Sequence, residues 1–153
     1  MFLLDGQDVL QLTKLDRSDT TPQVLLGSRA IFTASADLFG ANRDRSCQLF
    51  SISRTGDDLR QLTTFSGSGG NCTFGTPECY IDPVFADEKA GTLVFMSSCT
   101  VDATRPSSAQ IFTIDVDGRH LRQLTALSGF RVDADGAEVA ELPGPIAYES
   151  ARR

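Results

Sequence analysis

QLFSISRTGDDLRQLT at residues 48–63 and QIFTIDVDGRHLRQLT at residues 110–125 agree at nine of sixteen positions, at an offset of 62 residues. A shorter copy, FLLDGQDVLQLT, occupies residues 2–13, so the ending Gln-Leu-Thr occurs three times. Each copy has an apolar-rich run, a turn that contains Asp and Gly, and a second run. Gly accepts the positive φ that a tight hairpin turn requires. The repeat therefore predicts a β-hairpin in each copy.

A second repeated element accompanies the hairpins. AIFTAS at 30–35 and LVFMSS at 93–98 precede the two long hairpins, and IAYES at 146–150 is a third copy. Before the first two lie PQVLL at 22–26 and DPVFA at 82–86. Short runs rich in apolar and β-branched residues are typical of buried strands. Each complete unit is therefore predicted to have four strands, and no segment has the pattern of an ordinary amphipathic helix.

The hairpin motif resembles the WD-like β-propeller repeats of TolB-type proteins. DPVFADEKAGTLVFMSS at 82–98 is similar to a stretch of these repeats, although residues 86–91 stand where those repeats have a Ser-Pro-Asp-Gly turn. The loop at 36–42 is similar to an insertion in some members. The resemblance covers nearly all of the chain. It implies an all-β fold, namely a β-propeller of four-stranded antiparallel blades.

The strand count predicts a partial propeller over residues 1–153. Residues 1–13 form a half blade, residues 22–63 and 82–125 form whole blades, and residues 138–150 form a second half blade. This is about three blades' worth, whereas propellers typically have about four to eight blades. Three alternatives follow. Missing blades belong to a longer chain, two copies complete a six-bladed ring as a homodimer, or the three-blade array stays open.

Charge and hydropathy exclude two classes of partner. The net charge is −6, from 14 Lys and Arg against 20 Asp and Glu. An acidic chain lacks the basic surface of a nucleic-acid binder, so we expect no nucleic-acid partner. No apolar run approaches the roughly 20 residues of a membrane-spanning helix, so we expect no membrane span.

The four cysteines are disulfide candidates: Cys47, Cys72, Cys79 and Cys99. None forms a CxxC pair, which argues against a zinc ribbon or a thioredoxin-type motif. Four cysteines allow three pairings, and the favoured one joins Cys72 to Cys79 and Cys47 to Cys99. Disulfides imply an oxidising, extracytoplasmic compartment, periplasmic or secreted, although the N-terminal residues show no export signal. Four free thiols in a cytosolic protein are the alternative.

The long connections indicate where a partner would bind. Connections in an antiparallel meander alternate between the two ends of the strands. The long ones, at 36–47, 64–81, 99–109 and 126–137, share one end with all four cysteines, and we call this end the long-loop face. Long loops on a rigid scaffold commonly carry binding residues. The candidates at this face are Asp37, Asn42, Arg43, Asp44 and Arg105.

Catalytic, metal and cofactor sites are not predicted. The single histidine, His120, follows a turn at the opposite face and is interpreted as a solvated turn residue, so a Ser-His-Asp triad is difficult to build. The acidic run at 133–138 resembles half of a calcium loop but lacks its bidentate Glu, and is interpreted as an Asp-rich turn. Asp37, Asn42 and Asp44 form a second, weaker acidic cluster.

The sequence therefore predicts a non-catalytic β-propeller module that binds a protein or a peptide through the long-loop face. The alternative is the propeller portion of a larger enzyme, such as a propeller-bearing serine peptidase, with the catalytic residues outside this chain. A third possibility is an enzyme whose site is built from loop carboxylates, such as a lyase or a glycosidase. A fold alone does not establish a function, so all three stay open at this point.

Overall fold

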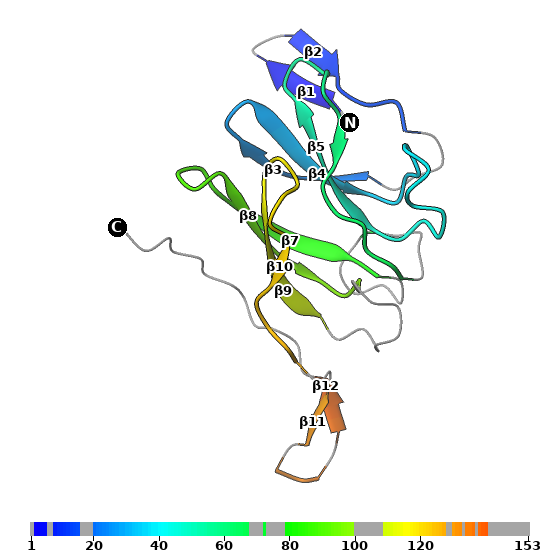
Figure 1. The fold of residues 1–153 in the computed structure, drawn as a ribbon, viewed down its shortest axis with the longest axis vertical. Coiled ribbons are helices and arrows are strands. Elements are labelled where there is room, and N and C mark those ends of the chain that lie inside the picture. Colours follow the sequence, from blue (N-terminus) through cyan, green and yellow to red (C-terminus); the bar gives the residue numbers. More distant parts are fainter. Residues whose placement is uncertain are drawn as a thin grey trace.

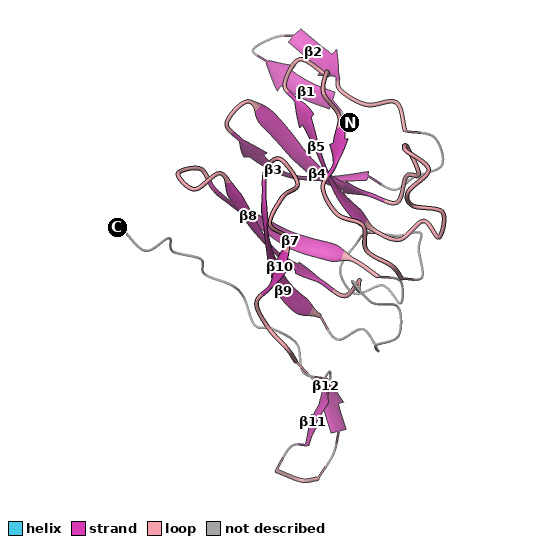
Figure 2. Cartoon of the chain, in the orientation of Figure 1, coloured by secondary structure: helices cyan, strands magenta, loops and turns pink. Residues whose placement is uncertain are grey.

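In the computed structural model of the chain, the regular secondary structure of the described residues consists of β-strands, which turns and loops connect (Figures 1 and 2). These residues are 2–5, 8–15, 20–67, 72, 79–99, 109–127, 130–132, 134–136 and 138–140. They form two four-stranded antiparallel sheets and two two-stranded hairpins. The prediction of an all-β fold with four-stranded antiparallel units is therefore confirmed.

The first sheet is a meander in which each strand pairs with the next along the chain. Its strands are β3 (Thr20–Leu26), β4 (Arg29–Ala34), β5 (Gln48–Ser53) and β6 (Arg60–Gln61). The register between β4 and β5 is regular from Arg29↔Ser53 to Ala34↔Gln48. Gly27, with a φ of +56°, makes the turn between β3 and β4, where a glycine accepts the left-handed backbone.

The second sheet repeats this meander. Its strands are β7 (Ile81–Asp87), β8 (Thr92–Ser97), β9 (Gln110–Asp115) and β10 (Arg122–Gln123). The two sheets pack against each other, and β3 lies next to β7 (Figure 1). The equivalent strands of the two predicted units therefore occupy equivalent places in the structure.

The first hairpin, β1 (Phe2–Asp5) with β2 (Asp8–Gln11), lies on the side of the first sheet away from the second sheet (Figure 1). The last hairpin joins β11 (Phe130–Val132) to β12 (Glu138–Ala140) around Gly136. The strand at 130–132 was not predicted. The predicted strand at 146–150 lies outside the described residues.

The central strands are buried on both faces because they lie between layers. In β4 and β5, Phe32, Phe50 and Ile52 pack with Leu12 toward the first hairpin, whereas Ile31 and other alternate residues pack toward the second sheet. Successive strand residues point to opposite faces of a sheet, so a strand that is buried on both faces reads as a continuous apolar run. The first sheet is therefore the middle layer, between the first hairpin and the second sheet.

The Gln-Leu-Thr ending has the same local structure in all three copies. The side-chain amide of Gln11 donates to the carbonyl oxygen of Thr13 at 3.0 Å, and Gln61 donates to that of Thr63 at 2.7 Å. Gln123 donates to the carbonyl oxygen of Thr125 at 2.5 Å. The first hairpin is thus a structural equivalent of the last two strands of each sheet.

Candidate functional site

Two glutamines at equivalent positions tie the end of each sheet to the chain that follows it. Gln48, the first residue of β5, accepts hydrogen bonds from the Thr63 hydroxyl and from the Phe65 amide, both at 2.9 Å, and donates to the Phe65 carbonyl at 2.7 Å. Gln110 makes the same three bonds with Thr125 and Leu127, at 2.8–3.0 Å. The Gln and the Thr that recur at the ends of the repeat therefore bond to each other, and we call this arrangement the Gln–Thr clamp.

In the first sheet, the clamp extends into the long loop at 36–47. The Gln48 side-chain amide also donates to the Ser46 hydroxyl at 2.6 Å and to Asn42 Oδ1 at 3.2 Å. Asn42 donates in turn to the carbonyl oxygens of Ala36 and Ser46, at 3.2 and 2.8 Å, so it closes the loop upon itself. All these polar groups are buried, and buried polar groups that are fully bonded rigidify the structure around them. The long loop is consequently a braced element.

Two of the predicted binding residues, Asp37 and Asp44, brace the same loop from outside. Asp37 Oδ1 accepts from the Asn42 backbone amide at 2.8 Å. Asp44 accepts from the Ser46 hydroxyl at 3.3 Å and, with its second oxygen, from the Gly67 amide at 3.4 Å. Asn42 itself is buried, so its contribution to partner binding would be indirect. The structure therefore brings these three residues together as loop supports.

The surface of the loop consists of other side chains. Leu38 and Phe39 are exposed, Phe39 to 56%, and they lie in the bend between Asp37 and Asn42. Arg43, which is one of the predicted binding residues, is exposed, and so is Arg45. We define the loop tip as Leu38, Phe39, Arg43 and Arg45. Leu38 and Phe39 are not among the predicted binding residues, although an apolar pair inside a polar loop is itself a signal. Arg105 lies outside the described residues.

The disulfide pairing differs from the favoured one. Cys47 bonds to Cys72 and Cys79 bonds to Cys99, with Cα atoms 5.2 and 4.7 Å apart. The register of β7 and β8 explains the second bond, because Ile81 opposite Ser97 continues to Cys79 opposite Cys99. The expected bond between the two sheets is thus absent, and one disulfide instead joins neighbouring strands of the second sheet. All four cysteines are paired, as predicted, and two disulfides are typical of oxidising compartments.

The two disulfides nevertheless meet at one place, beneath the long-loop face. The Cys47 backbone amide lies 3.4 Å from Cys79 Sγ, and the Cys47 carbonyl oxygen lies 3.6 Å from Cys99 Sγ. All four cysteines belong to the apolar core that the two sheets share, together with Phe65. Gly67 packs against this site so closely that a methyl group at its Cα would lie 2.8 Å from Cys79 Sγ. The disulfides therefore anchor the base of the long loops to the core.

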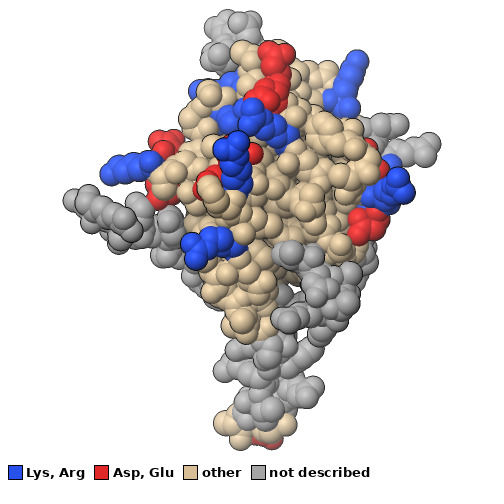
Figure 3. Space-filling view, viewed as in Figure 1, with Lys and Arg blue, Asp and Glu red and all other residues tan. Residues whose placement is uncertain are grey.

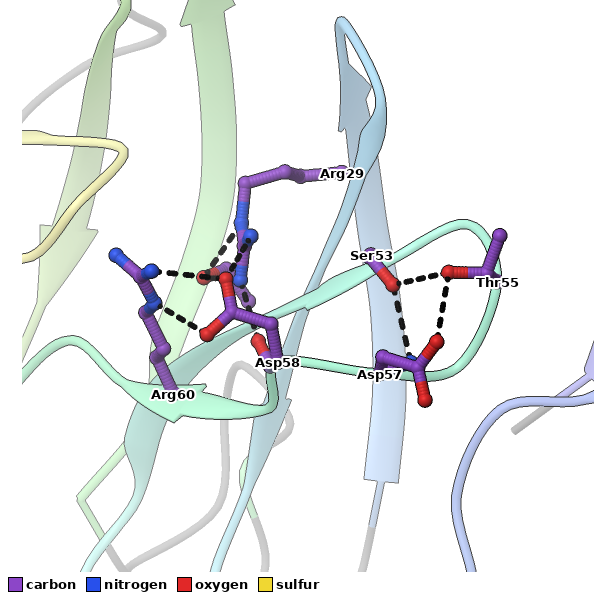
Figure 4. Close-up of polar contacts among 7 residues, drawn as sticks. Arg29, Ser53, Thr55, Asp57, Asp58 and Arg60 are labelled. Atoms are coloured by element: carbon purple, nitrogen blue, oxygen red, sulfur yellow. Dashed lines mark hydrogen bonds and ion pairs between the residues drawn. The ribbon is translucent and has the colours of Figure 1, made fainter.

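The opposite face carries a charged cluster at the turns of the first sheet (Figure 4). Arg29 donates to the Ser51 hydroxyl at 3.0 Å and to Asp58 Oδ2 at 2.9 Å, while Arg60 lies 2.8 Å from the same carboxylate. The hydrogen bonds from Arg60 and Arg29 lower the pKa of Asp58 below its ordinary value. Asp58 has a φ of +52°, so these bonds hold a backbone conformation that a non-glycine residue seldom adopts. The cluster is thus a turn support.

His120 occupies the place of Asp58 in the second sheet, with a φ of +54°. Its Nδ1 lies 2.7 Å from a carboxylate oxygen of Asp115, and its side chain is largely exposed. The interpretation of His120 as a solvated turn residue is confirmed. Of the acidic pattern at 133–138, residues 134–136 lie in the turn of the last hairpin, where Asp135 is exposed, and Glu138 begins β12. Among the described residues, no three His, Cys, Asp or Glu side chains gather as a metal site would require.

Charges of both signs are interspersed on the face that Figure 3 shows. Within the described segments, no helix is long and apolar enough to cross a membrane. Comparison with family models, with curated proteins and with solved structures found no match for this chain.

Proposed function

We propose that this chain is a non-catalytic module that binds a protein or a peptide through the long-loop face, with the loop tip as the contact surface. The observation that carries the proposal is the contrast between the two parts of the loop at 36–47. Its interior is bonded and buried, whereas two apolar and two basic side chains are presented outward. A rigid loop loses less conformational entropy on binding than a mobile one.

The proposed scaffold is a β-propeller in which the two sheets are consecutive blades. The support is the meander order of both sheets, the adjacency of β3 and β7, and the resemblance of the repeat to those of TolB-type proteins. Propellers place their connecting loops at the two ends of the blades, which suits a binding face built from loops. A periplasmic or secreted location is proposed with it, because both disulfides need an oxidising environment to form.

The chemistry of the loop tip suits a partner that offers an apolar side chain beside a carboxylate. Phe39 and Leu38 provide apolar contact area, and aromatic residues are enriched at the energetic centres of interfaces. Arg43 and Arg45 provide guanidinium donors, which bind carboxylates well. We therefore expect acidic peptides with aromatic or aliphatic residues to bind in preference to basic ones.

A peptide-display selection on the oxidised protein tests the proposal. Peptides are selected on the wild-type chain, and their affinities are measured by calorimetry for the wild type, for Phe39→Ala and for Arg43→Ala. The expected result is a set of acidic peptides that lose at least about tenfold in affinity with Phe39→Ala. The control is His120→Ala, at the opposite face, which should leave the affinity unchanged. A failure to enrich peptides, or equal binding to Phe39→Ala, would contradict the proposal.

A further inference from the structure

The leucine of the Gln-Leu-Thr ending is buried in two copies and exposed in the third. Leu12 and Leu62 are each 6% exposed, whereas Leu124 is 53% exposed. Leu12 packs in the core between the first hairpin and the first sheet, and Leu62 packs in the core between the two sheets. This position therefore faces the unit that follows it along the chain.

The same part of the following unit covers the leucine at both internal junctions. A methyl group built at Gly56, in the turn after β5, would lie 4.0 Å from Leu12 Cδ2. A methyl group at Gly118, in the turn after β9, would lie 3.5 Å from Leu62 Cδ2. Gly56 and Gly118 have nearly the same φ, +88° and +87°. One junction geometry is thus used twice.

A second position of the repeat faces the preceding unit. Leu59 packs against the core that the first hairpin shares with the first sheet, and Leu121 packs against the core between the two sheets. The equivalent residue of the first hairpin is Val9, three positions before Leu12 as Leu59 is before Leu62. Val9 is 67% exposed. Among the described residues, the second four-stranded sheet therefore presents an exposed forward-facing leucine, and the first hairpin presents an exposed backward-facing valine.

We propose that the surface around Leu124 binds the first hairpin of a second copy of this chain, with Val9 of that copy facing Leu124. The second copy is the occupant that the structure favours, because one chain carries both complementary halves of a junction that it already forms twice internally. The contact is head-to-tail, because the two copies use different surfaces. Such a contact forms a closed ring if the rotation that relates neighbouring copies brings the last copy back to the first. This inference concerns surfaces other than the loop tip and does not depend on the proposed function.

Sedimentation velocity of the oxidised chain at about 1 to 100 µM tests the association, with Leu124→Glu, Val9→Glu and the control Leu38→Glu. We expect the wild type and Leu38→Glu to self-associate, and each of the other two variants to raise the dissociation constant at least about tenfold. All three substituted side chains are exposed, and far-UV circular dichroism reports whether each variant folds.

A mixture of the two weakened variants tests the direction of the contact. Leu124→Glu retains Val9, and Val9→Glu retains Leu124, so a head-to-tail contact predicts that the 1:1 mixture forms more dimer than either variant alone. A wild type that is monomeric at 100 µM, as measured in the concentration series above, would overturn the proposal. So would a Val9→Glu variant that associates as well as the wild type, because it would show a contact that does not use the first hairpin.

Discussion

Cys79 lies directly opposite Cys99 on the continuation of the β7–β8 register, so their disulfide closes one end of the second sheet. Ser98 and Tyr80 lie between the strand ends and the two cysteines, and the Ser98 backbone amide donates to the Tyr80 carbonyl oxygen at 3.1 Å. This hydrogen bond extends the strand pairing as far as the disulfide. The disulfide thus fixes two neighbouring strands, while the contact between the sheets depends on apolar packing.

Non-reducing peptide mapping should recover a Cys47–Cys72 peptide pair and a Cys79–Cys99 pair. Replacing Cys79 and Cys99 together by alanine should lower the free energy of unfolding by about 3 kcal/mol, because a bond that closes a loop of 20 residues restricts the unfolded chain by about that amount. Urea unfolding measures the change. Recovery of a Cys72–Cys79 pair would contradict the observed pairing.

Gly67→Ala should destabilise the protein by about 1 to 3 kcal/mol, because the added methyl group would overlap Cys79 Sγ and Cβ. Urea unfolding of the oxidised protein measures this loss. The matched control is Gly27→Asn, where no atom lies within 4 Å of the added Cβ and asparagine tolerates the left-handed backbone. Equal stability of Gly67→Ala and the wild type would show that the chain at residue 67 does not pack against the disulfide.

Gln48→Leu should cost about 3 kcal/mol or more, and Gln110→Leu about 1 to 2 kcal/mol, although the two glutamines are equivalent in the repeat. Both substitutions break the Gln–Thr clamp, but Gln48 is fully buried and also bonds to Ser46 and Asn42. Chemical denaturation compares the two variants. An equal loss in both would mean that the deeper burial of Gln48 and its bonds to Ser46 and Asn42 add nothing to stability beyond the interactions of Gln110.

Asp58→Asn should lower stability at pH 7, and the difference from the wild type should shrink as the pH falls below about 4. A carboxyl whose pKa is lower in the folded state stabilises the protein fully above its unfolded-state pKa of about 4, and this contribution is lost as the pH falls through the folded-state pKa. Urea midpoints between pH 7 and pH 2.5 test the sign. Asp57→Asn is the control, since the Asp57 carboxylate accepts from Thr55 instead. A difference that stays constant over this pH range would refute the assignment.

The two sheets could be predicted because the repeat carries redundant information. Nine identities at an offset of 62 residues require equivalent backbones, and the continuous burial of β4, β5 and β8 agrees with their apolar runs. The disulfide pairing was missed because it was argued from which loops hold the cysteines. The pairing of β7 with β8 implies the observed Cys79–Cys99 bond, but the register shifts by one residue between Ile81 and Val84, and the sequence does not show this shift.

The sequence did not show which side chains of the candidate loop are bonded within the protein and which are exposed. Charged residues in a loop were taken as partner contacts, yet Asp37 accepts from an amide of its own loop, and Asp44 accepts from the Gly67 amide of the next long loop. Short acidic side chains often bond to nearby backbone groups, and the sequence alone does not show whether they do. The exposed pair Leu38 and Phe39 was overlooked because apolar residues in a sequence are first assigned to the core.

The same contact between a turn glycine and a leucine joins the units twice, at Gly56 with Leu12 and at Gly118 with Leu62. The geometry of this junction therefore does not depend on how many units the chain has. Each unit carries one forward-facing and one backward-facing position, so a gene that duplicates or loses a whole unit creates no mismatched surface. The number of units in such a chain can therefore change by whole units while this junction stays the same.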